Sequence, residues 1–315
     1  MGQRQGDDAP MGSQTSGRHF RQEAPAASSV PSGESAPQAP RGPRHTRRKL
    51  LSTALIVVGC ALLLVAAGMF GYAQWQYHKQ DEVNAQLAQF VSLPADQATT
   101  DAGSQSDGDA PQVDWAGLKA VNDDVVGWIQ IPGTVVNYPV YQGETNETYL
   151  RTSATGEYSV GGQIFMDYEN AKPGLVDGQT LVYGHHLMNG EMFAVVDEMA
   201  DQSYFDGVKT IWYVTEQGSY ELEPLLFYRT PATNGDARRT QFASADELHA
   251  YLKGLLGEAS AKGASADAAL NQVSKVLTLA TCDYDNDFGK GNGRGLVVCA
   301  LKGEVHPATG TEGSS

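Results

Sequence analysis

Residues able to carry nucleophilic chemistry occur at the edges of strand-like segments. Cys282 ends the apolar run TLATC, and the glycine-containing loop DYDNDFGKGNG separates it from Arg294. If the flanking strands pair as a hairpin, Arg294 returns close to Cys282, where a permanent cation can favour a thiolate or steady an oxyanion. A cysteine enzyme also needs a proton-handling partner. Only His185 and His186 lie at the end of a predicted core strand.

On spacing alone, a buried thiol beside two surface imidazoles remains an alternative to a Cys/His/Arg site. Strand alternation separates the two cysteines of the predicted hairpin. Arg294 shares a face with Leu296 and Val298, so Cys299 points away from it. We therefore expect Cys299 to be a buried apolar residue, without a disulfide to Cys282.

Metal sites fit the sequence poorly. DYDNDF resembles the start of a calcium loop, but Phe288 and Arg294 occupy the positions where an EF-hand needs Gly and Glu. His185, His186 and Cys282 lack an evident fourth zinc ligand. We expect no metal and no cofactor.

An uncharged apolar run predicts a membrane anchor at residues 50–73. Its apolar core, residues 50–72, exceeds the length needed to cross about 30 Å of hydrocarbon. RHTRRK directly precedes it, so the positive-inside rule predicts that residues 1–49 are cytoplasmic and that the chain after the anchor is extracellular. A cleaved signal peptide is the alternative, although its apolar region is usually shorter.

Composition divides the rest of the chain. Residues 1–49 are rich in Gly, Pro, Ser and Gln, which predicts a disordered cytoplasmic leader. Residues 74–112 are predicted to form an extracellular stalk, of which 74–90 could extend the membrane helix. A folded domain is expected at 113–304, followed by a tail at 305–315. Residues 80–315 contain 13 Lys and Arg against 33 Asp and Glu, a net charge of −20, which argues against nucleic-acid binding.

The folded part is predicted to be mainly β. Asp114 could cap a short helix before the first strand, and ADELHAYLKGLL, with Ser244 as a cap candidate, has helical apolar spacing. Short apolar runs between Gly, Pro, Asn and Asp suggest a closed or nearly closed antiparallel β structure. The predicted strands are 125–131, 135–140, 162–168, 178–186, 210–215, 218–230 and the two segments that flank the DYDNDF loop.

Several motifs together resemble class B sortases, a family of cysteine transpeptidases from Gram-positive bacteria. TLATC with Arg294 is similar to the family's TLxTC motif and downstream arginine. LVYGHHLMNGEMFA resembles the stretch that holds the family's histidine. DDVVGWIQIPGTVVNYPVYQG, TNETYL and GGQIFMDYEN resemble the N-terminal half of the domain. The resemblance covers about residues 113–304, with the motifs in the family's order.

The resemblance implies a closed eight-stranded sortase-type β-barrel with N-terminal helices and one helix in the loop before the seventh strand. It implies that Cys282 is the nucleophile, that His185 is the general acid/base because it follows the glycine directly, and that Arg294 stabilises the oxyanion or positions the substrate. Asn146 and Leu150 match positions that line the substrate groove. Thr281 and Asp283 are weaker candidates for that groove. The role of His186 stays open.

The implied partners are surface proteins with a C-terminal sorting signal, of the LPXTG-like or NPXTN-like kind. Their new carboxyl end would pass to an amine of a peptidoglycan precursor, or to a pilin lysine in a pilus-polymerising enzyme. A non-catalytic wall-binding domain on a membrane tether is the alternative from another class. With a thiol pKa of about 8.5 and an imidazole pKa of about 6.5, only part of the enzyme would be correctly charged, which predicts slow turnover and a bell-shaped pH profile.

Overall fold

The computed structural model describes residues 44–94, 109–283, 288 and 292–306. The predicted leader up to residue 43, the centre of the predicted stalk and the tail from residue 307 lie outside the described residues. Contacts between Cα atoms divide the chain into two compact units, Met1–Ala61 and Leu62–Ser315.

The first helix, α1 (Arg44–Ala88), contains the predicted membrane span. Its stretch from Lys49 is long and apolar enough to cross a membrane. The helix continues past the predicted end of the span, and its last turns pack against the barrel described below. Gln80 is buried and donates to the Gly162 carbonyl oxygen at 3.3 Å, and Leu87 is buried further along the helix. The structure thus places part of the predicted stalk in the folded unit.

The next elements connect α1 to the barrel. Strands β1 (Val91–Ser92) and β2 (Gln112–Val113) pair with each other. Helix α2 (Trp115–Val121) follows, and the Asp114 carboxylate accepts from the Gly117 amide at 3.0 Å. This contact confirms the predicted N-cap, which satisfies a donor that the helix start leaves unpaired.

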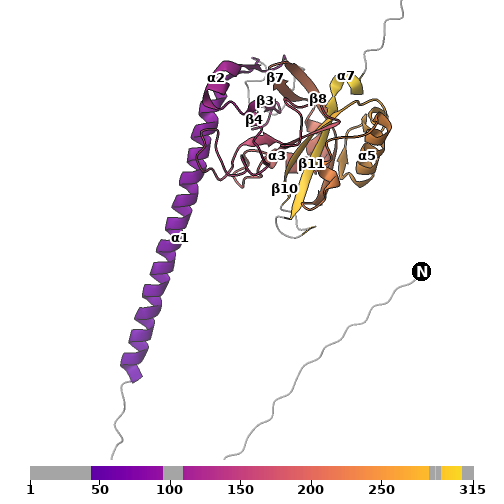
Figure 1. Cartoon of the computed structure of the whole chain (residues 1–315). Helices are drawn as coiled ribbons and strands as arrows, with labels where there is room; N and C mark the ends of the chain where they lie inside the picture. The colour runs from indigo at the N-terminus through magenta and orange to yellow at the C-terminus, as the bar shows by residue number, and fades with distance from the viewer. Residues whose placement is uncertain (1–43, 95–108, 284–287, 289–291, 307–315) are drawn as a thin grey trace, which may run out of the picture. The chain divides into compact units, whose positions relative to one another are not determined.

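Eight strands close into a barrel, as the resemblance implied (Figure 1). Neighbouring strands follow the order β11-β10-β6-β5-β4-β3-β7-β8, and β8 pairs with β11 to close the ring. A short ninth strand, β9 (Ala261–Lys262), adds to the edge of β8. The barrel strands are β3 (Val125–Gln130), β4 (Asn137–Tyr141), β5 (Ile164–Met166), β6 (Gln179–Tyr183), β7 (Ile211–Thr215), β8 (Gly218–Pro231), β10 (Val276–Asp283) and β11 (Gly293–Leu301).

Two of the barrel pairings are parallel, so the expectation of an antiparallel structure was wrong for them. Strand β4 runs parallel to β5, and β6 runs parallel to β10. Parallel neighbours need a crossover of about a dozen residues or more. The 142–163 segment provides one crossover, and everything between β6 and β10 provides the other.

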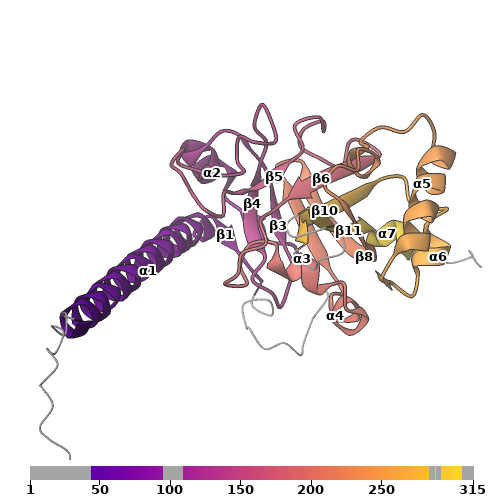
Figure 2. The same cartoon turned by 90° about the horizontal axis from the view of Figure 1, so that it is seen from below.

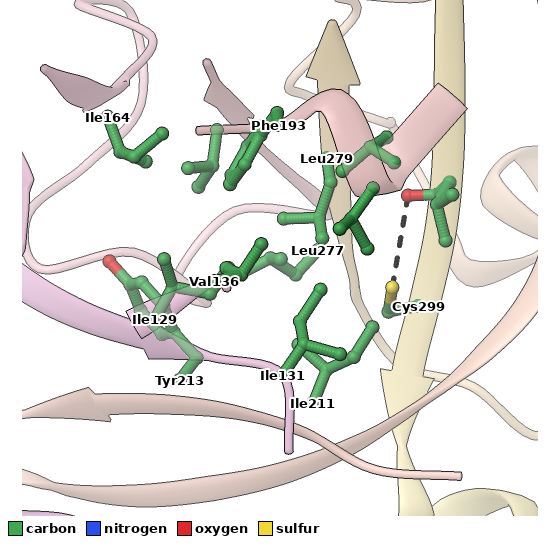
Figure 3. Close-up of a cluster of buried hydrophobic side chains, with 14 of the residues drawn as sticks. Ile129, Ile131, Val136, Ile164, Phe193, Ile211, Tyr213, Leu277, Leu279 and Cys299 are labelled. Atoms are coloured by element: carbon green, nitrogen blue, oxygen red, sulfur yellow. Dashed lines mark hydrogen bonds between the residues drawn. The ribbon is translucent and has the colours of Figure 1, made fainter. Parts of the chain in front are cut away.

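Side chains alternate between the barrel interior and its outer face along β10 and β11. Leu277, Leu279, Val297 and Cys299 belong to the interior core (Figure 3). Cys299 is 0% exposed, and burial raises the pKa of its thiol. The predicted inward orientation of Cys299, away from Arg294, is therefore confirmed.

Helix α5 (Ala245–Glu258) covers part of the outer face of the barrel (Figure 2). The Glu247 amide donates to the Ser244 hydroxyl at 3.3 Å, as expected for the predicted cap. The helix lies in the connection before β10, the seventh barrel strand, which confirms the implied position. Several shorter helices were not expected, because a single turn or two has too little periodicity to detect. They are α3 (Ala194–Glu198), α4 (Gln202–Gly207), η1 (Asp236–Arg238), α6 (Ala266–Ala269) and α7 (Lys302–Val305).

Candidate active site

Cys282 and Arg294 lie opposite each other near the open end of the β10–β11 hairpin. They are register partners in the antiparallel pair. Directly opposed residues project from the same face of a sheet, with Cβ atoms about 4.5–5.5 Å apart. By alternation with the inward Leu279 and Val297, both side chains belong to the outer face. The hairpin geometry expected from the sequence is therefore present.

The parallel pairing of β6 with β10 brings His185 to the same place. The Gly184 amide donates to the Ala280 carbonyl at 3.1 Å, and the Thr281 hydroxyl donates to the Gly184 carbonyl at 3.0 Å. A Cβ on Gly184 would lie 2.5 Å from an Ile164 side-chain carbon and equally close to Phe193. Only a glycine therefore fits here against the Ile164 and Phe193 side chains.

One surface cavity, here named the Cys282 cavity, brings most of the predicted site residues together. Six of them line it: Cys282, His185, Arg294, Asn146, Leu150 and Thr281. Asp283 ends β10 opposite Gly293, but its side chain lies outside what the structure describes. Residues from β10 and β11, from the segment after β6 and from the loop after β4 thus converge on one concave surface.

The hydrogen bond of His185 fixes which of its nitrogens carries the proton. Nε2 lies 2.6 Å from the Leu150 carbonyl oxygen, which can only accept, so Nε2 donates. Nδ1 is then the nitrogen that takes up a second proton. Burial lowers the pKa of His185, the bond to Leu150 opposes this, and the positive charges of Arg151 and Arg294 lower it further. The imidazolium form is therefore disfavoured at neutral pH.

The guanidinium of Arg294 bonds the backbone of the preceding residue. Its Nη1 donates to the Gly293 carbonyl at 2.7 Å. A guanidinium has five donors in a planar fork, so one bond to the backbone can orient the group while its other edge borders the cavity.

A buried carboxylate organises the polar floor of the Cys282 cavity. Asp167, 0% exposed, accepts from Asn146 Nδ2 at 2.9 Å and from the Tyr183 hydroxyl at 2.6 Å. Arg238 from η1 donates to the same oxygen through Nη2 at 3.1 Å. Asn146, Tyr183 and Arg238 all line the cavity. The sequence reasoning missed Asp167, Tyr183 and Arg238, and the Asp that follows a buried strand in FMDYEN was the one usable signal.

Replacing Asp167 with alanine is expected to destabilise the fold by about 3 kcal/mol, because the part-buried donors of Asn146 and Tyr183 would lose their acceptor. Urea unfolding followed by circular dichroism measures the change. Glu169→Ala is the matched control, since Glu169 is exposed and lies 3.7 Å from the same Arg238. It should change stability by less than about 0.5 kcal/mol. Equal effects of the two variants would contradict the organising role of Asp167.

Neither Cys60 nor Cys299 lines the Cys282 cavity. All three cysteines are unbridged, and Cys60 lies exposed on α1. Most of the DYDNDF segment lies outside the described residues. Within the ranges that the structure describes, no group of three His, Cys, Asp or Glu side chains is placed to hold a metal ion.

Comparison with known proteins gives one family. The model of the Sortase domain matches residues 129–302. Sortase B of Staphylococcus aureus is 34% identical over 167 residues, which cover 53% of this chain and 66% of the relative, just under two thirds of its length. Sortase B of Listeria monocytogenes is 27% identical over 234 residues, covering 74% of this chain and 93% of the relative.

Solved structures agree with the sequence comparisons. The crystal structure of Staphylococcus aureus sortase B matches with a TM-score of 0.52 at 30% identity, over 59% of this chain and 85% of that one. The sortase B structure from Bacillus anthracis in complex with AAEK1 matches with a TM-score of 0.57 at 26% identity, over 72% of this chain and 98% of that one. The likeness therefore extends to the whole barrel.

Proposed function

This chain belongs to the sortase family, class B, and we propose that it is a cell-surface transpeptidase that cleaves a C-terminal sorting signal after Thr. The proposed product is the surface protein joined to an amine of a peptidoglycan precursor. The observation that carries the proposal is the convergence of Cys282, His185 and Arg294 on one cavity. A solved relative, sortase B of Staphylococcus aureus, exists as a substrate complex, which supports a peptide as the first substrate.

In the first half-reaction the Cys282 thiolate attacks the carbonyl carbon of a Thr–Gly or Thr–Asn bond. Arg294 stabilises the negative charge that develops on the carbonyl oxygen. His185 gives a proton to the leaving amine, and the peptide bond is exchanged for a thioester on Cys282. Because Nε2 is held by Leu150, Nδ1 is the nitrogen proposed to carry this proton.

In the second half-reaction the acceptor amine attacks the thioester. Nδ1 of His185 takes the proton that the amine loses, and the Cys282 thiolate leaves. The thioester conserves the free energy of the cleaved peptide bond, so no external energy source is needed. A sortase B structure in complex with triglycine supports an amine-bearing acceptor for the family.

The rim of the Cys282 cavity is proposed to bind the sorting signal. Asn146, Leu150 and Thr281 line the cavity beside the nucleophile. Leu150 is 39% exposed and offers an apolar surface, while the side-chain amide of Asn146 is fixed by Asp167. We retain Asp283 as a substrate contact on the strength of the resemblance alone.

The proposed location is the cell membrane. Residues 50–73 would anchor the chain, with residues 1–49 cytoplasmic and the catalytic domain extracellular. The apolar stretch of α1 and the basic segment before it support this orientation.

The proposal is tested by incubating the protein with peptides that carry LPXTG-like and NPXTN-like signals. Intact mass should show an acyl group on Cys282, and added oligoglycine, diaminopimelate peptides or a pilin lysine peptide should release it as the transpeptidation product. The productive acceptor distinguishes wall anchoring from pilus assembly. Absence of acyl-enzyme with every signal would contradict the proposed transpeptidase function.

The pH profile of kcat/KM gives a separate prediction. The active form carries a thiolate on Cys282 and an imidazolium on His185, and we expect the acid limb of the profile to report the pKa of His185. Because burial lowers the pKa of His185, we expect that limb below pH 6.5. Arg151→Gln removes a nearby positive charge, so it should move the limb upward by a few tenths of a pH unit.

Lys253→Gln is the control for this prediction, because it removes one positive charge from the exposed face of α5, away from the cavity. It should leave the acid limb in place. A flat profile from pH 5 to 10, or equal shifts in both variants, would contradict the assignment of the limb to His185.

A further inference from the structure

The second imidazole of the histidine pair contacts the backbone of the nucleophile strand. His186 does not line the Cys282 cavity. Its Nδ1 lies 3.2 Å from the carbonyl oxygen of Cys282 and 3.5 Å from Oδ2 of Asp197. Both of these oxygens can only accept, so Nδ1 of His186 carries a hydrogen and donates. The two adjacent histidines thus present different nitrogens to different partners.

The carboxylate of Asp197 forms an ion pair with Arg229. Asp197 lies on α3, with a side chain 11% exposed, and its Oδ1 accepts from Arg229 Nη2 at 3.1 Å. A Cβ on Gly295 would lie 3.0 Å from the same oxygen. The glycine after Arg294 therefore leaves room for the carboxylate. The Asp197 carboxylate reaches β11 next to Arg294, while His186 reaches β10 at Cys282.

The imidazole of His186 bonds the Cys282 carbonyl at the position where the next backbone hydrogen bond between β6 and β10 would lie. Gly184 makes a backbone bond from its amide to the Ala280 carbonyl. In a parallel ladder the next equivalent bond would run from the amide of residue 186 to the Cys282 carbonyl. His186 instead lies opposite Met192 in an isolated antiparallel bridge, where the Phe193 amide donates to the His185 carbonyl at 2.8 Å. The side chain supplies the missing donor, which matters because a partly buried carbonyl without a partner is unfavourable.

We propose that His186 and Asp197 form a positioning pair that holds the carbonyl of Cys282 and thereby fixes the nucleophile at the end of β10. The proposal rests on the proposed function, in which Cys282 is the nucleophile. Within the described residues, β10 pairs with β11 as far as Asp283, but its register with β6 ends at Ala280, two residues before Cys282. The hydrogen bond from His186, whose imidazole Asp197 on α3 contacts in turn, restrains the Cys282 carbonyl on this side. His185 can then transfer protons while His186 holds the strand.

Asparagine separates this role from a role in proton transfer. The Nδ2 of an asparagine occupies nearly the place of a histidine Nδ1 and donates a hydrogen bond, but it does not titrate at these pH values. His186→Asn should therefore keep kcat within about threefold of the unaltered enzyme. His186→Leu removes the donor and should lower kcat about 30-fold with KM changed less than about twofold, as small misplacement of a reacting group does.

The matched control is His249→Leu. His249 on α5 also bonds a backbone carbonyl, from Nε2 to Val273 at 2.9 Å, but it lies outside the Cys282 cavity. Its loss should lower the melting temperature without changing kcat per folded molecule. Asp197→Asn, added to His186→Leu, should lower kcat by less than twofold more, because the pair acts as a unit.

Acyl-enzyme formation and thioester aminolysis are assayed on the full chain in detergent, at a temperature where circular dichroism shows each variant folded. Unchanged kcat in His186→Leu would overturn the proposal. A His186→Asn enzyme as slow as His186→Leu would overturn it too, since it would assign the imidazole to proton transfer. If His186→Leu does not fold, comparison of His186→Asn with Asp197→Asn still decides, because Asp197→Asn alone should then lower kcat by at least threefold.

A second measurement tests the positioning pair independently of the proposed transpeptidase function. Alkylation of Cys282 by iodoacetamide, followed by intact mass, needs no peptide substrate. His186→Leu should slow it about threefold or more, because the thiol shifts away from the Arg294 guanidinium, while His186→Asn and His249→Leu should not. The enzyme could be inactive on every peptide and still show this alkylation pattern. That result would contradict the transpeptidase function but support the positioning pair.

Discussion

Replacing Cys282 with alanine is expected to lower transpeptidation by at least about 10⁴-fold and to abolish the acyl-enzyme. The thiol is the proposed covalent carrier of the substrate, and a methyl group cannot form the thioester. The fold should survive, because Cys282 lies at the surface cavity rather than in the barrel core. The measurement is the rate of signal-peptide cleavage together with intact protein mass.

Cys299→Ala is the matched control for this experiment. It makes the same chemical change at the neighbouring strand, five residues after Arg294, but Cys299 is 0% exposed in the core. Loss of the buried sulfur should lower stability by about 1 kcal/mol and leave the rate per folded molecule unchanged. Acylation that persists in Cys282→Ala, or disappears in Cys299→Ala, would contradict the assignment of the nucleophile.

Most barrel strands could be predicted from the sequence because they are short runs rich in β-branched and aromatic residues between turn residues. Strand β3 has the sequence VVGWIQ and β7 has IWYVT, and both are buried throughout. Helix α5 was predictable for a different reason. Leu248, Leu252 and Leu255 recur at helical spacing, and they are the side chains that it buries.

Pairing between distant segments was not predictable from local pattern. The parallel neighbours β4–β5 and β6–β10 depend on where long connections return the chain, and propensity does not encode this. The same limit applies to the last turns of α1. Gln80 is a surface residue by type, and its hydrogen bonds with Ser159 and Gly162 across the fold explain its burial.

In the candidate site, too, the features set by local pattern were predictable, and those set by pairing between distant segments were not. Local alternation placed Cys282 and Arg294 on one face and Cys299 on the other, and the register confirms both. The choice of His185 over His186 came from the family resemblance, because two adjacent histidines look alike in composition. The Asp167 network escaped prediction because Asn146, Tyr183 and Arg238 come from three separated segments. Their convergence depends on the closed barrel.

Replacing Arg294 with lysine is expected to lower kcat about 10² to 10³-fold, the range seen when one stabilising donor of an oxyanion is lost. The charge is conserved in this variant, so the loss would come from geometry. The guanidinium bonds the Gly293 carbonyl through Nη1 and still borders the cavity. A lysine ammonium is a single point of charge on a flexible stem, and it cannot bond the backbone and reach the oxyanion along two fixed directions.

Single-turnover acylation of Cys282 is the measurement for Arg294→Lys, because it isolates the step in which the oxyanion first forms. Arg239→Lys is the control, since Arg239 pairs with Glu247 outside the cavity and tolerates an ammonium in that exposed ion pair. A loss confined to KM would mean that Arg294 binds the ground state and the transition state equally, which assigns it to substrate binding. An unaltered acylation rate in Arg294→Lys would remove directional bonding by the guanidinium from the mechanism and leave only its charge.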